Sequence, residues 1–244
     1  MATVVGIAVA GEPPTIVRGG SMILEIDGGV TPRALPKYEF APLSIHASGR
    51  LSTVDGSHPP ALRRSVLDTD RDVVVSVKGL PVCRIGELQA RSSKQAEEIC
   101  GDAIIGRGSA TVEVAFPEQG PFDSTGPLTL FNGGERNGVV TMFAHAYVSV
   151  PAPTAVIAVA RLIRVSKGPY GLHPVIDIPV IAGGSGSVIA ANIKMGRVYT
   201  YKGQRRSVFA GRCRDGRIQA RGTFEYGDGT SLSGAVVRAC AVAG

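Results

Sequence analysis

Apolar and polar residues alternate with a period of two over much of the chain, as expected of strands that bury one face. The alternation is clearest at residues 109–116, where the apolar positions are Ala110, Val112, Val114 and Phe116. Similar runs lie at 21–26, 43–47, 72–78, 128–131, 139–150, 154–165, 175–181 and 188–201. Turn residues such as Asn137-Gly138 separate them. The pattern predicts a mainly β protein with antiparallel, sandwich-like sheets.

One stretch, residues 84–100, has a helical pattern instead. Within it, Ser92-Ser93-Lys94-Gln95 contains Ser-x-x-Gln, a capping box that starts a new helix. We therefore expect two short helices, around residues 85–90 and 93–99, that fold back on each other. The predicted fold is mainly β with one short helical hairpin insert.

The division into domains is less sharply marked. Pro and Gly residues gather at 120–127 and 151–153, and residues 41–45 faintly resemble residues 152–156. We expect a single β-rich domain over residues 11–244. Two lobes, residues 11–150 and 151–244, are the open alternative.

Composition agrees with many short strands. The chain has 32 Gly, 16 Pro and no Trp among 244 residues, and 44% of its residues are apolar. That apolar share excludes a disordered chain. Charge is not concentrated in a tail, so nucleic acid is an unlikely partner. The longest apolar stretch, residues 139–160, contains His145, Pro151 and Pro153, so no transmembrane segment is expected.

The first ten residues are apolar and end in Ala8-Val9-Ala10, followed by Gly11-Glu12-Pro13-Pro14. Small residues at that spacing are what a signal peptidase requires. We interpret residues 1–10 as a signal-peptide remnant, truncated by a late start codon, with the mature chain beginning near Gly11. A frayed N-terminal strand is the alternative.

The four cysteines favour local pairing. Cys83 and Cys100 flank the helical insert, and the break at Ser92 allows the two helices to bring them together. Residues 207–213, 217–226 and 230–240 predict a three-stranded meander, which would place Cys213 and Cys240 at the same end. We predict the disulfides Cys83–Cys100 and Cys213–Cys240, and an oxidising compartment.

Four segments stand out beside these features: Gly79-Leu80-Pro81-Val82-Cys83, Cys100-Gly101-Asp102-Ala103-Ile104-Ile105-Gly106-Arg107-Gly108, Leu130-Phe131-Asn132-Gly133, and Cys213, Asp228-Gly229 and Cys240. Together they resemble an uncharacterised family of exported actinobacterial proteins, over most of the chain beyond the first strand. The resemblance implies export and the same two local disulfides. No activity is established for that family, so the resemblance implies no catalytic residue.

Two groups of polar residues could carry chemistry. Asp68, Asp70 and Asp72 alternate as at the start of an EF-hand loop, but the later Gly and Glu of that motif are missing. A solvated turn is the expected structure, and we predict no metal site and no cofactor. His58 lies near Asp55 in a loop, where an acid–base pair is conceivable, although a structural loop histidine is favoured.

The strongest regional signal is basic. Residues 194–221 hold nine Lys and Arg residues against one Asp. Arg197, Tyr199 and Tyr201 share one face of the predicted strand 188–201, and Arg217 and Arg221 share one face of strand 217–226. If these strands are neighbours, they form a basic patch with aromatic flanks. Its partner would be an anionic cell-envelope polymer or a membrane surface, and a solvated outer face is the alternative.

These observations predict an exported cell-envelope or extracellular protein that is a non-enzymatic binding module. One alternative is a secreted hydrolase with a loop-borne site around Asp55 and His58, for which a pocket should gather the histidine, a carboxylate and a hydroxyl. Another is a structural surface protein that assembles through an exposed, unpaired edge strand.

Overall fold

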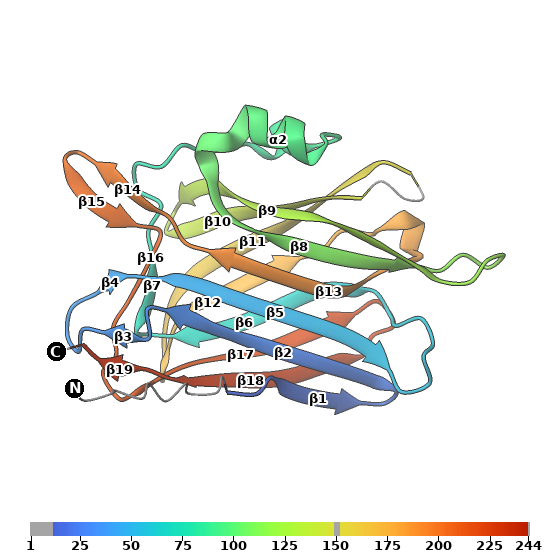
Figure 1. The fold of residues 1–244 in the computed structure, drawn as a ribbon, viewed down its shortest axis with the longest axis horizontal. Helices are drawn as coiled ribbons and strands as arrows, with labels where there is room; N and C mark the ends of the chain where they lie inside the picture. The colour runs from blue at the N-terminus through green and yellow to red at the C-terminus, as the bar shows by residue number, and fades with distance from the viewer. Residues whose placement is uncertain (1–11, 149–151, 244) are drawn as a thin grey trace, which may run out of the picture.

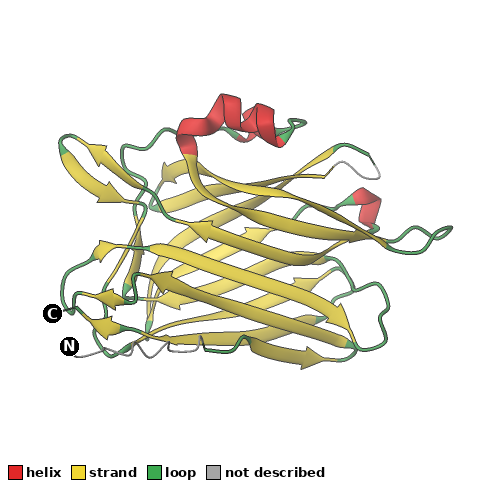
Figure 2. Cartoon of the chain, in the orientation of Figure 1, coloured by secondary structure: helices red, strands yellow, loops and turns green. Residues whose placement is uncertain are grey.

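The computed structural model describes residues 12–148 and 152–243 (Figure 1). The predicted signal-peptide remnant lies outside these residues. Strands account for 61% of the structure and helices for 8% (Figure 2). The mainly β, antiparallel fold with one short helical insert is therefore confirmed.

One sheet of 12 strands dominates the molecule, and each neighbouring pair in it is antiparallel. In spatial order the strands are β1 (Thr15–Gly19), β2 (Met22–Thr31), β5 (Ser44–Thr53), β13 (Gly186–Met195), β8 (Ile104–Val114), β9 (Phe122–Arg136), β10 (Val139–Val148), β11 (Thr154–Lys167), β12 (Tyr170–Asp177), β6 (Leu62–Asp70), β17 (Arg217–Tyr226) and β18 (Ser231–Ala239). Strands from before and after residue 150 are interleaved in this sheet. For example, β13 lies between β5 and β8, and β6 lies between β12 and β17.

Smaller elements gather at one end of the large sheet (Figure 1). They are the three-stranded sheet β4 (Ala41–Pro42), β16 (Phe209–Gly211) and β7 (Val73–Val75), the hairpin β14 (Val198–Tyr201) and β15 (Gln204–Ser207), and the parallel pair β3 (Ala34–Leu35) and β19 (Ala241–Val242). The helical elements are α1 (Ile85–Leu88), α2 (Ser93–Cys100) and the 3-10 turns η1 (Gly101–Ala103) and η2 (Ala182–Gly184).

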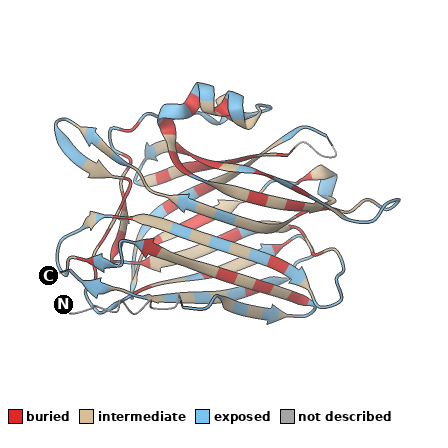
Figure 3. Ribbon diagram, viewed as in Figure 1, coloured by how far each residue is buried: buried red, intermediate tan, exposed pale blue. Residues whose placement is uncertain are grey.

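The large sheet curls so that its two halves pack against each other. The main core joins Val30 of β2, Leu130 of β9, Leu172 of β12 and Ile218 of β17, which are far apart in strand order. Side chains of β7 and β16 pack into the same core. Buried positions accordingly alternate with exposed ones along many strands (Figure 3), which is the period-two pattern of the sequence.

Curling brings the two edge strands, β1 and β18, side by side (Figure 1). Among the described residues, side-chain contacts join them rather than a backbone ladder. The Thr15 hydroxyl of β1 donates to the Ala235 carbonyl of β18 at 2.9 Å, and just before β1 the Glu12 carboxylate accepts the Ala239 amide at 3.2 Å. Each edge strand is thus covered by the other, which is the opposite of the exposed edge that a protein assembling through its sheet edges would need.

The helical hairpin packs on the outer face of the curled sheet, above β9 and β10 (Figure 1). Consecutive residues of β10 show the two faces: Met142 belongs to the main core, whereas Phe143 packs under the helices. The predicted capping box is present. The Gln95 backbone amide donates to the Ser92 hydroxyl at 3.3 Å, and the Ser92 backbone amide donates to the Gln95 side-chain oxygen at 3.0 Å.

Both predicted disulfides, Cys83–Cys100 and Cys213–Cys240, are present, with Cα atoms 5.5 and 6.0 Å apart. The strand pattern around the second pair needs correction. Residues 209–211 form β16, which pairs with β4 and β7 instead of β17, so only the β17–β18 hairpin of the predicted meander exists. Burial of β16 between two short strands outweighed its sequence proximity to β17.

The predicted strand 188–201 is also wrong as one element, because it breaks after Met195. Gly196 has a φ of +144°, and a Cβ on it would lie 2.9 Å from the Cα of Ser44. Only glycine allows this approach and this backbone conformation. The break directs residues 198–207 away from the large sheet, as a separate hairpin.

Candidate functional site

The predicted basic patch does not form as expected. Tyr199 and Tyr201 lie on β14, which pairs only with β15 among the described strands, while Arg217 and Arg221 lie on β17 between β6 and β18. The two groups are therefore not on neighbouring strands. Arg197 lies in the break before β14, where its guanidinium donates to the carbonyls of Asp102 at 2.6 Å and Ile104 at 3.2 Å.

The acidic triplet explains where much of the basic charge goes. Asp72 is buried, and it accepts a hydrogen bond from the Nε of Arg212 and of Arg214, each at 2.8 Å. Asp70 is buried beside it, which raises the pKa of its carboxyl, and it accepts the amides of Asp72 at 2.9 Å and Gln219 at 3.2 Å. The expected solvated turn is thus wrong, because these carboxylates hold distant parts of the chain together.

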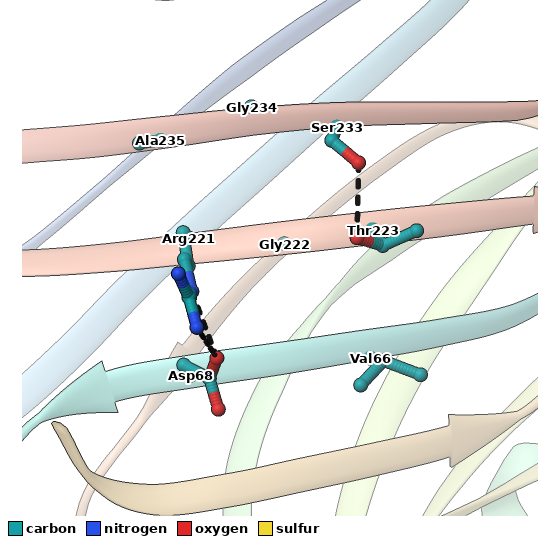
Figure 4. A pocket seen from close by; sticks show the side chains of 8 residues that line it. All are labelled: Val66, Asp68, Arg221, Gly222, Thr223, Ser233, Gly234 and Ala235. Carbon is teal, nitrogen blue, oxygen red and sulfur yellow. Dashed lines mark hydrogen bonds and ion pairs between the residues drawn. The ribbon is translucent and has the colours of Figure 1, made fainter. Parts of the chain in front are cut away.

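The third carboxylate, Asp68, pairs with Arg221 across the β6–β17 ladder, at 2.8 Å (Figure 4). It also contacts the Nδ1 of His173 at 2.8 Å, and the Arg221 guanidinium lies 4.6 Å from the centre of the Tyr170 ring. Burial favours the neutral carboxyl, but the hydrogen bonds from His173 and Arg221 outweigh it and lower the pKa of Asp68. Arg217 lies 3.7 Å from Asp215.

A shallow hollow adjoins this ion pair on the outer face of β6, β17 and β18. Figure 4 shows Val66, Arg221 and the Thr223 and Ser233 hydroxyls around it, the two hydroxyls being 2.9 Å apart. Arg221 already directs its Nε and one terminal nitrogen to Asp68. The hollow therefore offers polar atoms that largely satisfy one another, which disfavours it as an anion site.

The β14–β15 hairpin has the opposite character. Residues 198–207 contain Lys202, Arg205 and Arg206 and no Asp or Glu, and among the described residues none of the three contacts a carboxylate. The turn is tight, because Lys202 and Gly203 have φ values of +51° and +74°, the conformation of a two-residue hairpin turn. Lys202 and Arg205 are exposed, and Arg206 is half-buried.

Two tyrosines hold the hairpin against the body of the protein. The Tyr199 hydroxyl donates to the Lys78 carbonyl at 2.9 Å, and partial burial raises the pKa of Tyr199. The Tyr201 ring lies against Gly79, which has a φ of +87° and no room for a Cβ. Lys202 and Arg206 lie within 5.7 and 5.8 Å of the Tyr201 ring centre, a distance at which the ring attracts cations.

A second hollow lies beside the hairpin. Its lining comes from the loop after β7 and from the end of β9, and consists of Val77, Lys78, Gly79, Leu80, Val82, Gly134 and Glu135. The Glu135 carboxylate is engaged by Arg164 at 2.6 Å. The hollow therefore combines apolar side chains with Lys78, which has no carboxylate partner among the described residues.

The residues of the hydrolase alternative lie elsewhere. The His58 Nδ1 is 2.6 Å from the Glu113 carboxylate, whereas Asp55 accepts from the Ser57 amide and hydroxyl within its own turn. The pairing of His58 with Asp55 that the hydrolase alternative invoked is therefore absent, and His58 is a loop histidine as favoured from the sequence. The two hollows described above do not include His58.

A metal site is not favoured at the one cluster of suitable residues among those described. Cys83, Glu87 and Cys100 lie close together, but the two sulfurs form a disulfide and the Glu87 carboxylate accepts the Arg84 amide at 2.6 Å.

Comparisons with protein-family models, with curated proteins and with solved structures find no match. The two disulfides indicate a non-reducing environment. Within residues 12–148 and 152–243, no helix has the length and apolarity needed to cross a membrane.

Sequence reasoning found the basic residues but missed the hairpin that displays three of them. It also missed Lys78 and Val82, which lie far from the basic stretch in sequence. The available signal for the turn was the pair Lys202-Gly203, which follows Tyr-Thr-Tyr and precedes a polar segment. The signal was weak because Asn-Gly is the usual pair at such a turn.

Proposed function

We propose that this is an exported, non-enzymatic binding protein for anionic cell-envelope polymers, and that the β14–β15 hairpin makes the contact. One observation carries the proposal. Apart from Lys194 on β13, the basic residues elsewhere in the stretch 194–221 are engaged by carboxylates or carbonyls, whereas Lys202, Arg205 and Arg206 have no carboxylate partner among the described residues.

The hairpin suits a repeating anion better than one small ligand. Lys202 is at the turn, and Arg205 and Arg206 are consecutive residues of β15, paired with Thr200 and Tyr199. Because consecutive residues of a strand point to opposite faces, the hairpin has a cation on each face and one at the turn. An exposed set of this kind attracts charge without fixed stereochemistry. The attraction acts over a Debye length of about 8 Å at physiological ionic strength, so it must weaken as salt is added.

Export is a part of the proposal with separate support. The disulfides need a non-reducing compartment, and the apolar N-terminus ending in Ala8-Val9-Ala10 and the resemblance to exported actinobacterial proteins agree with it. N-terminal sequencing of protein from the culture medium checks it. A mature chain that begins near Gly11 is expected, and an intact Met1 in the medium would contradict it.

Binding is tested with a soluble teichoic-acid-like polymer over a salt series. The variant Lys202→Asn/Arg205→Gln removes two exposed charges, and Asn suits the positive φ at the turn. Exposed ion pairs contribute about 0.2–1 kcal/mol each, so affinity should fall by about 2- to 30-fold.

The matched control is Arg217→Gln/Arg221→Gln, which also removes two charges but ones already paired within the protein. It should bind nearly as the unmodified protein does. Equal losses in both variants would show a general charge effect, and binding that is insensitive to salt and to the hairpin variant would refute the proposal.

A further inference from the structure

Exposed apolar side chains gather around the Cys83–Cys100 disulfide. Val82, Ile85 and Ile99 keep 54%, 40% and 50% of their surface exposed. All three are within two residues of the Cys83–Cys100 disulfide, whose Cα atoms are 5.5 Å apart. With 3.8 Å between consecutive Cα atoms, the backbones of Val82 and Ile99 are at most about 13 Å apart. The disulfide thus holds an exposed apolar group in place.

This apolar group is continuous with the hairpin site. Val82 lines the same hollow as Lys78 and Gly79, and the Tyr201 ring lies against Gly79. The loop that carries these residues runs between the hairpin and the helices (Figure 1). One end of the molecule therefore presents cations and apolar side chains together.

Three carboxylates near this face have cationic partners, while Glu87 and Asp102 have none among the described residues. Glu135 pairs with Arg164, Glu97 contacts Arg107, and Glu98 lies 3.9 Å from Lys94. The three hairpin cations, together with the exposed Lys78 and Arg84, outnumber these two carboxylates, so the described residues around the apolar group carry a net positive charge. A partner complementary to this face must be both anionic and able to cover apolar side chains.

We propose that this face docks on the surface of an anionic lipid bilayer. The hairpin cations contact the headgroups, and Val82, Ile85 and Ile99 enter the boundary between headgroups and acyl chains. A hydrated polymer alone leaves those three side chains in water, whereas a bilayer offers anionic charge and an apolar layer in one plane. The inference rests on one part of the proposed function, the β14–β15 hairpin as the contact with the anion, and it names the setting in which the anion is presented.

The two contributions have different expected sizes. Each Lys or Arg near an anionic membrane surface contributes about fivefold in affinity, so the Lys202→Asn/Arg205→Gln variant should lose about 25-fold on vesicles. Burial of one valine side chain contributes about tenfold, so the Val82→Asp variant should lose at least about tenfold. High salt should weaken the first contribution more than the second.

The test is flotation with vesicles of equal parts phosphatidylglycerol and phosphatidylcholine, and with phosphatidylcholine alone. The matched control for Val82→Asp is Val54→Asp, since Val54 is 70% exposed after β5, at the opposite end of the sheet (Figure 1). Both variants add the same charge. Binding to the mixed vesicles should fall for Val82→Asp and change little for Val54→Asp, and Ile99→Asp is a second variant in case Val82→Asp does not fold.

The soluble polymer separates this inference from the proposed function. If the protein binds the polymer but neither kind of vesicle, or if Val82→Asp, Ile99→Asp and Val54→Asp lose vesicle binding equally, the bilayer proposal is overturned and the polyanion function stands. If it binds mixed vesicles with the expected dependence on Val82 but not the polymer, the bilayer proposal holds and the polymer function fails.

Discussion

Acid should loosen the helical hairpin through one buried histidine. His145 on β10 is fully buried beneath the hairpin, edge-on to Phe131 with ring centres 6.4 Å apart. Its Nε2 donates to the Arg91 carbonyl at 3.0 Å, in the turn between α1 and α2, while its buried Nδ1 has no hydrogen-bond partner among the described residues. A proton on Nδ1 would therefore place a charge in an apolar site without an acceptor.

Burial lowers the pKa of His145 from its ordinary value of 6.5, although the Arg91 carbonyl and the charge of Glu97 act in the opposite direction. Above pH 6.5 the side chain is neutral in both the folded and the unfolded chain, so it has no effect on the pH dependence of stability. Below pH 6.5 the unfolded chain takes up the proton first. The folded state then loses about 1.4 kcal/mol per pH unit until the folded pKa is reached.

The comparison variant is His145→Gln, whose side-chain amide can still donate to the Arg91 carbonyl but cannot titrate. Urea unfolding of both proteins between pH 7.5 and 4.5 should give free-energy profiles that diverge only below about pH 6.5, with the unmodified protein losing more. Hydrogen exchange should place the loss in α1 and α2, while β17 and β18 stay protected. Parallel profiles for the two proteins would refute this account of His145.

Three further outcomes are expected. Asp72→Asn should cost about 2–3 kcal/mol in urea unfolding, because it leaves two arginines without their buried carboxylate; a loss below about 0.5 kcal/mol, the usual scale of surface changes, would contradict it. Gly79→Ala should lower the melting temperature and displace the Tyr201 ring of the hairpin from the loop at Gly79, because Ala strains the positive φ and its Cβ meets the ring; an unchanged melting temperature would count against that packing. Burial, with the charge of Asp228, raises the pKa of Tyr226 to about 12, so stability should fall above pH 10 by about 1.4 kcal/mol per unit relative to Tyr226→Phe; an identical alkaline profile in the two proteins would disprove it.

Local features were predictable from the chain itself. Period-two alternation located strands because a half-buried strand needs it whatever its neighbours are. Ser92 and Gln95 marked the helix break because a capping box is complete within four residues. The disulfides and the β17–β18 hairpin also followed from short spacings, since chain connectivity leaves few ways to join nearby segments.

Strand order and the pairing of charges were decided by the tertiary structure. Alternation does not state which strand is next to which, so nothing in the sequence placed β13 between β5 and β8 or curled the sheet until β1 met β18. That order joins Asp72 to Arg212 across 140 residues and His58 to Glu113 across 55. Strand alternation is a property of neighbouring residues along the chain, whereas charge attraction acts through space. The sequence therefore revealed a basic stretch, but only the fold determined that the cations of the β14–β15 hairpin, and not those of β17, lack a carboxylate partner among the described residues.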